Sequence, residues 1–308
     1  MLNSPKMTLS IFIVVTFIAI ILAISISSIA PYIEAFGNRM ESNNLESNYN
    51  PDKILSLDIF ADIVQDRINS IIDVLEFISD NQVLSTLPYI SSVREINHGI
   101  PSHLDQNKRQ VIDTILKIIP DIASIYFVLP DGNIYLGEPY AHQEQLPRLN
   151  FADREWYIGV STTNNTYVSS VFLSASINAP AIAVAVPVLP INQSANLVST
   201  PKEAPLGYLV GIVNLQSVKE AIEKIDTDVT GRFLVIDRNG TELVNPFDSP
   251  TNKTINKFDY FDMLDQKSSQ SSSSSKQTFV YNQNSTTVYY KPISFEGGEL
   301  IAILETNN

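Results

Sequence analysis

The sequence predicts an α+β protein with an N-terminal transmembrane helix, a long amphipathic helix and two tandem modules built on antiparallel sheets. Three observations support this fold class: an apolar run near the N-terminus, a following stretch with helical periodicity, and two similar hairpins separated by about the length of a small domain. The chain has 308 residues and 44% of them are hydrophobic, which is typical of one large or two modest globular domains.

The N-terminus carries the apolar run. From Ile11 to Ala30 it spans about 20 residues with few polar interruptions, enough to cross a bilayer. We predict a short cytoplasmic tail over residues 1–8, a transmembrane helix over 9–30 and a juxtamembrane linker over 31–50, with the bulk of the chain extracytoplasmic. A cleaved signal peptide is the alternative, although its apolar region is normally only about 7–15 residues long.

The next predicted element is a long helix over residues 51–85. Pro51 suits the first turn of a helix and Asp52 suits its positive end. From Ile54 to Ile78 apolar residues recur at spacings of three and four, which is typical of a helix with one buried face. Such a helix serves as a stalk, as a dimer seam or as the support of a sheet, and its sequence leaves these roles open.

A larger module is predicted over residues 86–225. A helix is expected from Gln106 to Ile119, because Pro120 cannot continue it. Alternating apolar residues on both sides of Asp131-Gly132 predict a hairpin. The remaining predicted elements are strands over 167–175, 182–188 and 208–215 and a helix over 217–224.

A smaller module is predicted over residues 226–306. It opens with a hairpin of the same design, in which Asn239-Gly240 forms the turn between strands 232–236 and 242–244. Further strands are predicted over 279–281, 287–292 and 300–304, after a serine-rich loop over 268–275.

The composition excludes several classes of function. The net charge is −13 and the basic residues are scattered, so no basic patch is available for nucleic acid. The chain has no cysteine, and His98, His103 and His142 lack the spacing of metal ligands. No phosphate-binding, dinucleotide-binding or nucleophile motif occurs. We therefore expect no nucleic-acid partner, no metal, no cofactor and no enzymatic activity.

Arg154, Trp156 and Tyr157 form a candidate binding segment. A guanidinium binds a carboxylate through two parallel hydrogen bonds, an aromatic wall excludes water, and a phenol orients the ligand. The same residue types also describe a structural tryptophan covered by a surface arginine. The choice between these interpretations depends on the surrounding segments.

The order of these segments resembles the double Cache domain, an extracytoplasmic sensing module of chemoreceptors, sensor kinases and cyclases. The resemblance extends from Pro51 to about Glu305. The segments that carry it are 154–159, 167–175 with 183–188, 207–215 and 231–240. It implies two PAS-like modules, of which the membrane-distal one, here 86–225, binds the ligand and 226–306 is membrane-proximal.

The resemblance also implies a ligand class. In amino-acid-binding members, the Arg-x-Trp-Tyr run holds the ligand carboxylate, while a Tyr-x-Asp pair and a further aspartate hold the ammonium. Phe172 and Ser174 stand where the Tyr-x-Asp aligns, and Asn214 stands where the aspartate aligns. Because a buried ammonium needs a carboxylate, a small organic anion is expected rather than a free amino acid.

We therefore predict a membrane-anchored ligand-binding sensor domain of the signal-transduction or chemotaxis type. Its expected partner is a small carboxylate-bearing molecule, and its candidate ligand-binding residues are Arg154, Trp156, Tyr157, Phe172, Ser174, Asn214 and Tyr126. Since the sequence stops after the last predicted strand, either the chain is truncated or it passes its state to a separate partner or works as a homodimer. The alternative function is a cell-surface solute-binding or adhesion module that does not signal.

Overall fold

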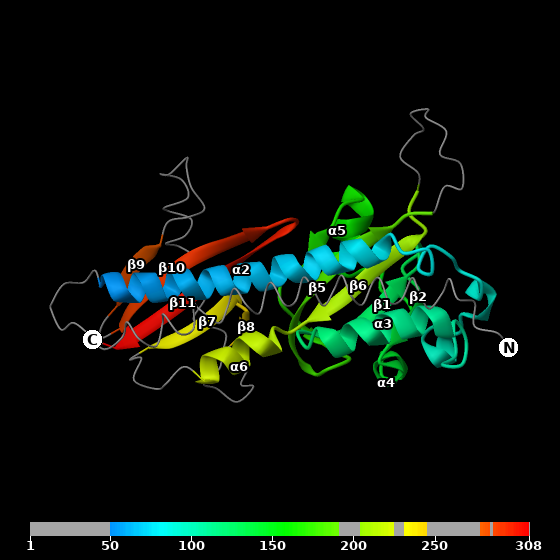
Figure 1. The fold of residues 1–308 in the computed structure, drawn as a ribbon, viewed down its shortest axis with the longest axis horizontal. Coiled ribbons are helices and arrows are strands. Elements are labelled where there is room, and N and C mark those ends of the chain that lie inside the picture. The colour runs from blue at the N-terminus through cyan, green and yellow to red at the C-terminus, as the bar shows by residue number, and fades with distance from the viewer. Residues whose placement is uncertain (1–49, 191–203, 225–230, 245–277, 284–285, 308) are drawn as a thin grey trace, which may run out of the picture.

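Two antiparallel sheets lie one after the other along a single long helix (Figure 1). The protein is represented by a computed structural model, which describes residues 50–190, 204–224, 231–244, 278–283 and 286–307. The predicted α+β class with two antiparallel sheets is confirmed. The predicted tail, transmembrane helix, serine-rich loop and nearly all of the linker lie outside these residues. Within the described ranges, no helix combines the length and hydropathy that a bilayer crossing requires.

The long helix is α2 (Pro51–Ser79). It begins as predicted, because the side-chain oxygen of Asn50 accepts hydrogen bonds from the N–H groups of Asp52 and Lys53 at 3.0 and 3.4 Å. It ends before the predicted limit of residue 85. Asn81 follows the helix and its side chain accepts the N–H of Val83 at 2.9 Å, a local bond that competes with further helical bonding.

The buried face of α2 supports both sheets. Near its start, the ring of Phe60 lies 4.9 Å from the ring of Phe233 in the second sheet. Near its end, Leu75 packs against the backbone of Gly211 in the first sheet, so closely that a Cβ there would lie 2.9 Å from it. Of the three roles left open by the sequence, the helix therefore serves as the support of the sheets.

The two sheets are called distal and proximal after their predicted positions relative to the membrane. The first, or distal, sheet has the strand order β2-β1-β6-β5-β3, with β4 paired to β5. Its strands are β1 (Ile122–Val128), β2 (Ile134–Glu138), β3 (Tyr167–Val168), β4 (Phe172–Ser174), β5 (Ala179–Val188) and β6 (Gly207–Val213). Its helices are α3 (Gln106–Ile118), α4 (Tyr140–Glu144), α5 (Glu155–Thr163) and α6 (Gln216–Lys224), together with the short η1 (Ile90–Ser92) and η2 (Glu95–Asn97).

Three features of this module differ from the sequence prediction. The structure adds α4 and α5, for which no helix was predicted. The single strand predicted over 167–175 is two short strands, because the turn between them, residues 169–171, has one residue more than the stretch of β5 that it faces. In that turn Ser170 donates its N–H to the Glu155 carboxylate and Val171 donates its N–H to Asp237, at 3.0 and 2.9 Å.

The two faces of the distal sheet carry different cores. One face packs against α2 and α3 and includes Ile125, Phe127, Ile182 and Leu209. The other face packs against α5, and its side chains come from the alternate residues of the same strands. These are Tyr126, Val128, Ala181, Ala183, Ala185, Tyr208, Val210 and Ile212. The small alanines of β5 leave room on this face for the larger side chains of α5.

The second, or proximal, sheet has the order β8-β7-β11-β10-β9. Its strands are β7 (Arg232–Asp237), β8 (Glu242–Val244), β9 (Phe279–Gln283), β10 (Thr286–Phe295) and β11 (Gly298–Asn307). The predicted hairpin is confirmed as the antiparallel pair of β7 and β8. The last strands are longer than predicted, because β10 and β11 form one continuous hairpin around Glu296 and Gly297.

Lys108 is a fully buried cation in the distal module. Its ammonium donates to the carbonyls of Val83, Leu84 and Thr86 at 3.0, 2.9 and 2.8 Å and lies 4.7 Å from the centroid of the Phe127 ring. These bonds tie the segment after α2 to α3. Burial lowers the pKa of Lys108 to about 8, because desolvation penalises the charged form.

The stability that Lys108 contributes is expected to rise with pH. The pKa of an unfolded lysine is about 10.5, so below pH 8 both states are charged and the folded state bears the full cost of burial. Above pH 8 the folded state loses its proton first and this cost disappears. Relative to Lys108→Met, wild type should gain about 2 kcal/mol of unfolding free energy between about pH 7.5 and 9.5.

Urea denaturation of both proteins across this range measures the change. Lys117→Met is the matched control, since Lys117 lies on the same helix in an exposed pair with Asp113. A difference between wild type and Lys108→Met that stays constant with pH would contradict the prediction.

Candidate ligand-binding pocket

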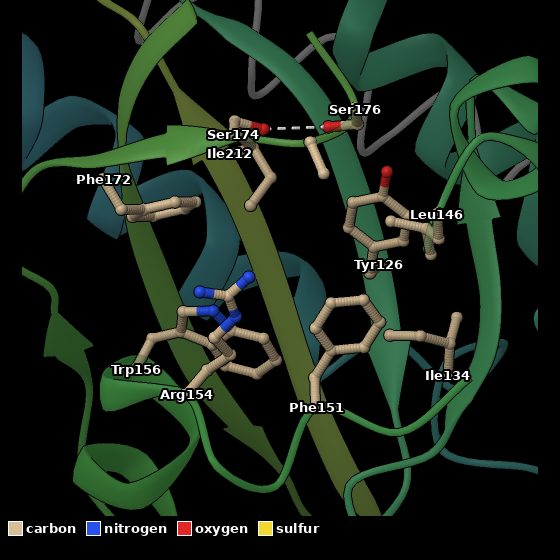
Figure 2. A pocket seen from close by; sticks show the side chains of 11 residues that line it. Tyr126, Ile134, Leu146, Phe151, Arg154, Trp156, Phe172, Ser174, Ser176 and Ile212 are labelled. Carbon is tan, nitrogen blue, oxygen red and sulfur yellow. Dashed lines mark hydrogen bonds between the residues drawn. The ribbon is translucent and has the colours of Figure 1, made fainter. Parts of the chain in front are cut away.

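A pocket lies on the α5 side of the distal sheet (Figure 2). It contains about 420 Å³ of space, part of it open to solvent. It is lined by Tyr126, Ile134, Leu146, Phe151, Arg154, Trp156, Phe172, Ser174, Ala175, Ser176 and Ile212. The structure thus brings together five of the seven residues predicted from the sequence, namely Tyr126, Arg154, Trp156, Phe172 and Ser174.

Arg154 is held at the start of α5 by the turn before it. Its N–H donates to the carbonyl of Phe151 at 3.0 Å, and the N–H of Phe151 donates to Gly132 in the β1–β2 turn at 2.8 Å. The neighbouring acid, Asp153, forms an ion pair with Arg148. Within the described part of the chain, the Arg154 guanidinium has no hydrogen bond or ion pair, and it points into the pocket in Figure 2.

The surroundings of Arg154 favour a negative charge. Every other lining residue is uncharged, so no carboxylate of the described lining competes for the guanidinium. The positive end of the α5 dipole lies beside the arginine and adds to the same potential. An anion that enters the pocket therefore meets a guanidinium that has no hydrogen bond or ion pair with any described residue.

Aromatic rings form the wall next to Arg154. Trp156 is buried and stacks on Phe151 with ring centroids 6.5 Å apart. The Tyr157 ring makes edge-to-face contacts with Trp156 and Tyr208, with ring centroids 6.2 and 5.7 Å apart. Phe172 adds a ring from β4, as Figure 2 shows. This wall excludes water and so strengthens any charge-assisted bond to Arg154.

Two predicted site residues do not line the pocket. The Tyr157 hydroxyl donates to the carbonyl of Pro130 at 2.5 Å, so this residue supports the β1–β2 turn and the Trp156 ring. Burial raises the pKa of Tyr157, which keeps the phenol protonated as a donor. Asn214 follows β6, and its N–H donates to the carbonyl of Asp121 at 3.1 Å.

A group of serine hydroxyls lies at another part of the pocket, and of its members the sequence indicated Ser174 but not Ser176 or Ser124. The hydroxyls of Ser174 and Ser176 lie 3.0 Å apart, and that of Ser124 lies 3.4 Å from Ser176. Alternation in the sequence carries a signal for this group, because Phe172, Ser174 and Ser176 are two residues apart. The signal is weak, since Ser176 lies in the turn after β4.

The pocket is joined to the proximal module through the chain around β4. Glu155, beside Arg154, accepts the N–H and the hydroxyl of Ser170 at 3.0 and 3.1 Å. The next N–H, of Val171, donates at 2.9 Å to Asp237, which is buried at the end of β7. Phe172 follows directly and lines the pocket. One short segment therefore contacts the candidate site on one side and the second sheet on the other.

The sequence profile of the Cache domain matches residues 43–307, most of the chain. The chain belongs to the double Cache domain family. The two sheets along α2 are therefore the two modules of a double Cache domain. No curated protein matches this double Cache domain in sequence at a significant level.

Solved structures show the same fold. One is an extracellular ligand binding receptor from Desulfohalobium retbaense DSM5692, with a TM-score of 0.54 and 12% identity over 82% of this chain and 40% of that one. Two are ligand binding domains of Pseudomonas aeruginosa PAO1 amino acid chemoreceptors. PctB in complex with L-Arg has a TM-score of 0.54 and 15% identity over 83% of this chain and 87% of that one. PctC in complex with GABA has a TM-score of 0.52 and 16% identity over 80% and 95%.

At these identities the likeness establishes the fold and leaves the ligand open. This double Cache domain spans less than half of the Desulfohalobium receptor but nearly the whole of the two Pseudomonas domains. Among the residues that the structure describes, no cluster of three or more histidines or acids could hold a metal ion.

Proposed function

We propose that this double Cache domain is an extracytoplasmic sensor that binds a small organic anion in its distal pocket. The observation that carries the proposal is the Arg154 guanidinium, which lines the pocket without a partner among the described residues. A carboxylate would satisfy its parallel N–H groups and neutralise its charge. Trp156 and Phe172 would shield that contact from water.

The comparison structures support a carboxylate, since both L-Arg and GABA carry one. Those ligands also carry a cationic group, which the present lining does not favour. Phe172 and Ser174 stand in the pocket where an acid would be needed, and none of the other lining residues is acidic. A buried ammonium would remain without a counter-charge at a cost of several kcal/mol, on the order of the penalty for an unpaired buried ion.

The proposed role is signalling without catalysis. The helix predicted over 9–30 would anchor the domain in the membrane, and the distal pocket would pass its state through the proximal module to a signalling partner. A homodimer along the outer face of α2 is not part of this proposal. Asp66 and Asp73 are exposed there and Asp62 pairs with Lys291, so the face carries acidic groups that would repel those of a second copy.

The test is a thermal-shift and calorimetric screen of small carboxylates on the full chain in lipid nanodiscs. We expect Arg154→Ala to weaken binding of any hit by about 30-fold or more, because a bidentate charge-assisted contact contributes roughly 2 kcal/mol. Arg238→Ala is the control, since it removes the same charge from an exposed pair with Glu299 in the proximal module. A hit whose affinity survives Arg154→Ala would overturn the proposal.

A further inference from the structure

Tyr126 carries a buried hydroxyl that has no well-made hydrogen bond with any of the described residues. Its side chain projects from β1 to the pocket side of the sheet and is only 4% exposed. The phenol oxygen lies near the hydroxyls of Ser124 and Ser176 but forms no well-made hydrogen bond with any described residue. Buried hydroxyls are nearly always hydrogen-bonded, so an exception beside a binding pocket calls for an explanation.

The surroundings of this phenol are made of hydroxyls. Ser174 and Ser176 line the pocket and are 2% and 6% exposed, and Ser124 lies behind them at 0%. Figure 2 shows the Ser174–Ser176 bond and the Tyr126 hydroxyl in one region of the pocket, away from the Arg154 guanidinium. The pocket therefore has two polar regions, a cationic one at Arg154 and a neutral one formed by the hydroxyls of Tyr126, Ser174 and Ser176.

The neutral region of the pocket favours an uncharged polar group of the ligand. A ligand with an ammonium there would find no carboxylate, and a second carboxylate would find no second cation, because Arg154 is the one charged lining residue described. An apolar group would leave the Tyr126 hydroxyl without a partner. An uncharged oxygen suits the site, since each hydroxyl donates one hydrogen bond and accepts up to two.

We propose that the ligand is a hydroxy- or oxo-carboxylate, with its carboxylate on Arg154 and its neutral oxygen hydrogen-bonded to Tyr126 and the serine hydroxyls. This inference rests on the proposed function, because it assumes that Arg154 holds the carboxylate. It goes further by assigning the opposite end of the ligand and the residue that recognises it. Tyr126 then acts as a specificity-determining residue.

Four acids of equal length test the assignment. Butyrate, 4-hydroxybutyrate, 4-aminobutyrate and succinate share a carboxylate and differ at the far end in a methyl, hydroxyl, ammonium or second carboxylate group. Hexanoate, 6-hydroxyhexanoate, 6-aminohexanoate and adipate repeat the comparison at greater length. Calorimetry on the full chain in nanodiscs should give the hydroxy acid the highest affinity in at least one series. The unsubstituted acid should bind about 3- to 10-fold more weakly, and the amino acid and the diacid about 30-fold more weakly or worse.

Tyr126→Phe tests the role of the phenol hydroxyl without changing the shape of the ring. The variant keeps the ring and removes an oxygen that has no well-made hydrogen bond among the described residues, so its thermal stability should match wild type or exceed it. It should abolish the 3- to 10-fold advantage of the hydroxy acid over the unsubstituted acid. Ser176→Ala should reduce the same advantage. Tyr89→Phe is the control, because Tyr89 is 38% exposed and lies outside the lining.

The outcomes separate the two proposals. If acids bind through Arg154 but the hydroxy acid has no advantage, or keeps it in Tyr126→Phe, the ligand assignment is wrong while the anion site stands. Equal or tighter binding of the amino acid or the diacid would also overturn the assignment. If no acid in either series binds, or binding ignores Arg154→Ala, both proposals fail.

Discussion

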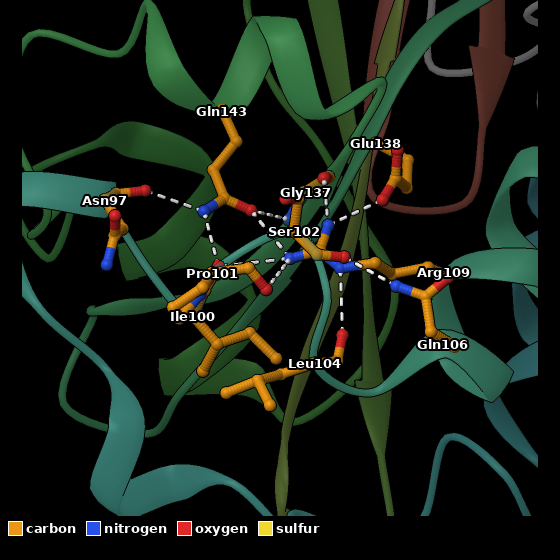
Figure 3. Close-up of polar contacts among 10 residues, drawn as sticks. All are labelled: Asn97, Ile100, Pro101, Ser102, Leu104, Gln106, Arg109, Gly137, Glu138 and Gln143. Atoms are coloured by element: carbon orange, nitrogen blue, oxygen red, sulfur yellow. Dashed lines mark hydrogen bonds and ion pairs between the residues drawn. The ribbon is translucent and has the colours of Figure 1, made fainter.

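Replacement of Arg109 by methionine is expected to lower the free energy of unfolding by about 3–5 kcal/mol. Arg109 is 5% exposed and lies at the centre of the polar cluster in Figure 3. Its Nη1 contacts the Glu138 carboxylate at 2.5 Å and the carbonyl of Gly137 at 3.1 Å. Its Nη2 and Nε donate to the carbonyls of Ile100 and Leu104, both at 3.1 Å.

The size of this effect follows from what the variant leaves behind. Glu138 would keep a charge with only 12% of its side chain exposed, and several carbonyls would lose their donors. Gln143 would remain in the cluster, where it accepts the N–H of Gly137 at 2.9 Å and donates to Asn97 at 2.7 Å, as Figure 3 shows. It cannot supply a positive charge. Arg109 thus joins α3, β2, α4 and the loop before α3.

Urea denaturation followed by circular dichroism measures this loss. Arg148→Met is the matched control, because Arg148 pairs with Asp153 where both side chains are exposed, and such pairs contribute about 0–1 kcal/mol. A double variant, Arg109→Met with Glu138→Leu, should recover part of the loss, since it removes the stranded charge as well. If Arg109→Met costs no more than Arg148→Met, the assigned role of the cluster is wrong.

The sequence predicts well those elements whose buried face is regular and long. α2 repeats its apolar residues over many turns, and the β1–β2 and β7–β8 hairpins combine alternation with an Asp or Asn before glycine. Local sequence and tertiary packing agree in these segments. Their positions and pairing could therefore be derived without knowledge of the rest of the chain.

α5 could not be derived in this way. It is rich in aromatic and β-branched residues, which locally favour a strand. The helix is stabilised by contacts that are distant in the sequence, since Trp156 and Val160 pack on the alanine-rich face of the sheet. Gly159 allows the Tyr167 ring to lie against the helix, where a Cβ would come within 2.4 Å of it. Tertiary packing decides this element.

The geometry of α5 explains why one predicted site residue of this helix lines the pocket and the next does not. In an α-helix neighbouring side chains point about 100° apart, so Trp156 reaches the pocket while Tyr157 turns towards Pro130. Asn214 lies just after the end of β6, where its N–H donates to the carbonyl of Asp121, and it is not among the lining residues. The sequence indicates Ser174 through the alignment with the family motif and Tyr126 through its position on a predicted strand. Their hydroxyl environment depends on packing that no local pattern encodes.

Asp121 is the second residue whose loss should have a large effect. Its carboxylate is fully buried and contacts the Arg67 guanidinium of α2 at 2.6 Å. It also accepts the N–H of Ser217 at 2.6 Å and its hydroxyl at 2.7 Å, at the start of α6. The pair thus fixes the supporting helix, the entry to β1 and the helix that leads towards the proximal module.

Asp121→Asn is expected to lower the free energy of unfolding by about 3–5 kcal/mol, because it strands the 8%-exposed Arg67 without a counter-charge. Trp156 is the only tryptophan, so its fluorescence reports unfolding of the distal module, while circular dichroism reports the whole chain. Since α2 contributes to the core of both modules, both signals should shift together to lower urea concentration.

Asp113→Asn, in an exposed pair with Lys117, should change stability by less than about 0.5 kcal/mol. A fluorescence transition that shifts alone would show that the modules unfold separately, and a loss no larger than that of Asp113→Asn would mean that the buried pair does not hold this junction.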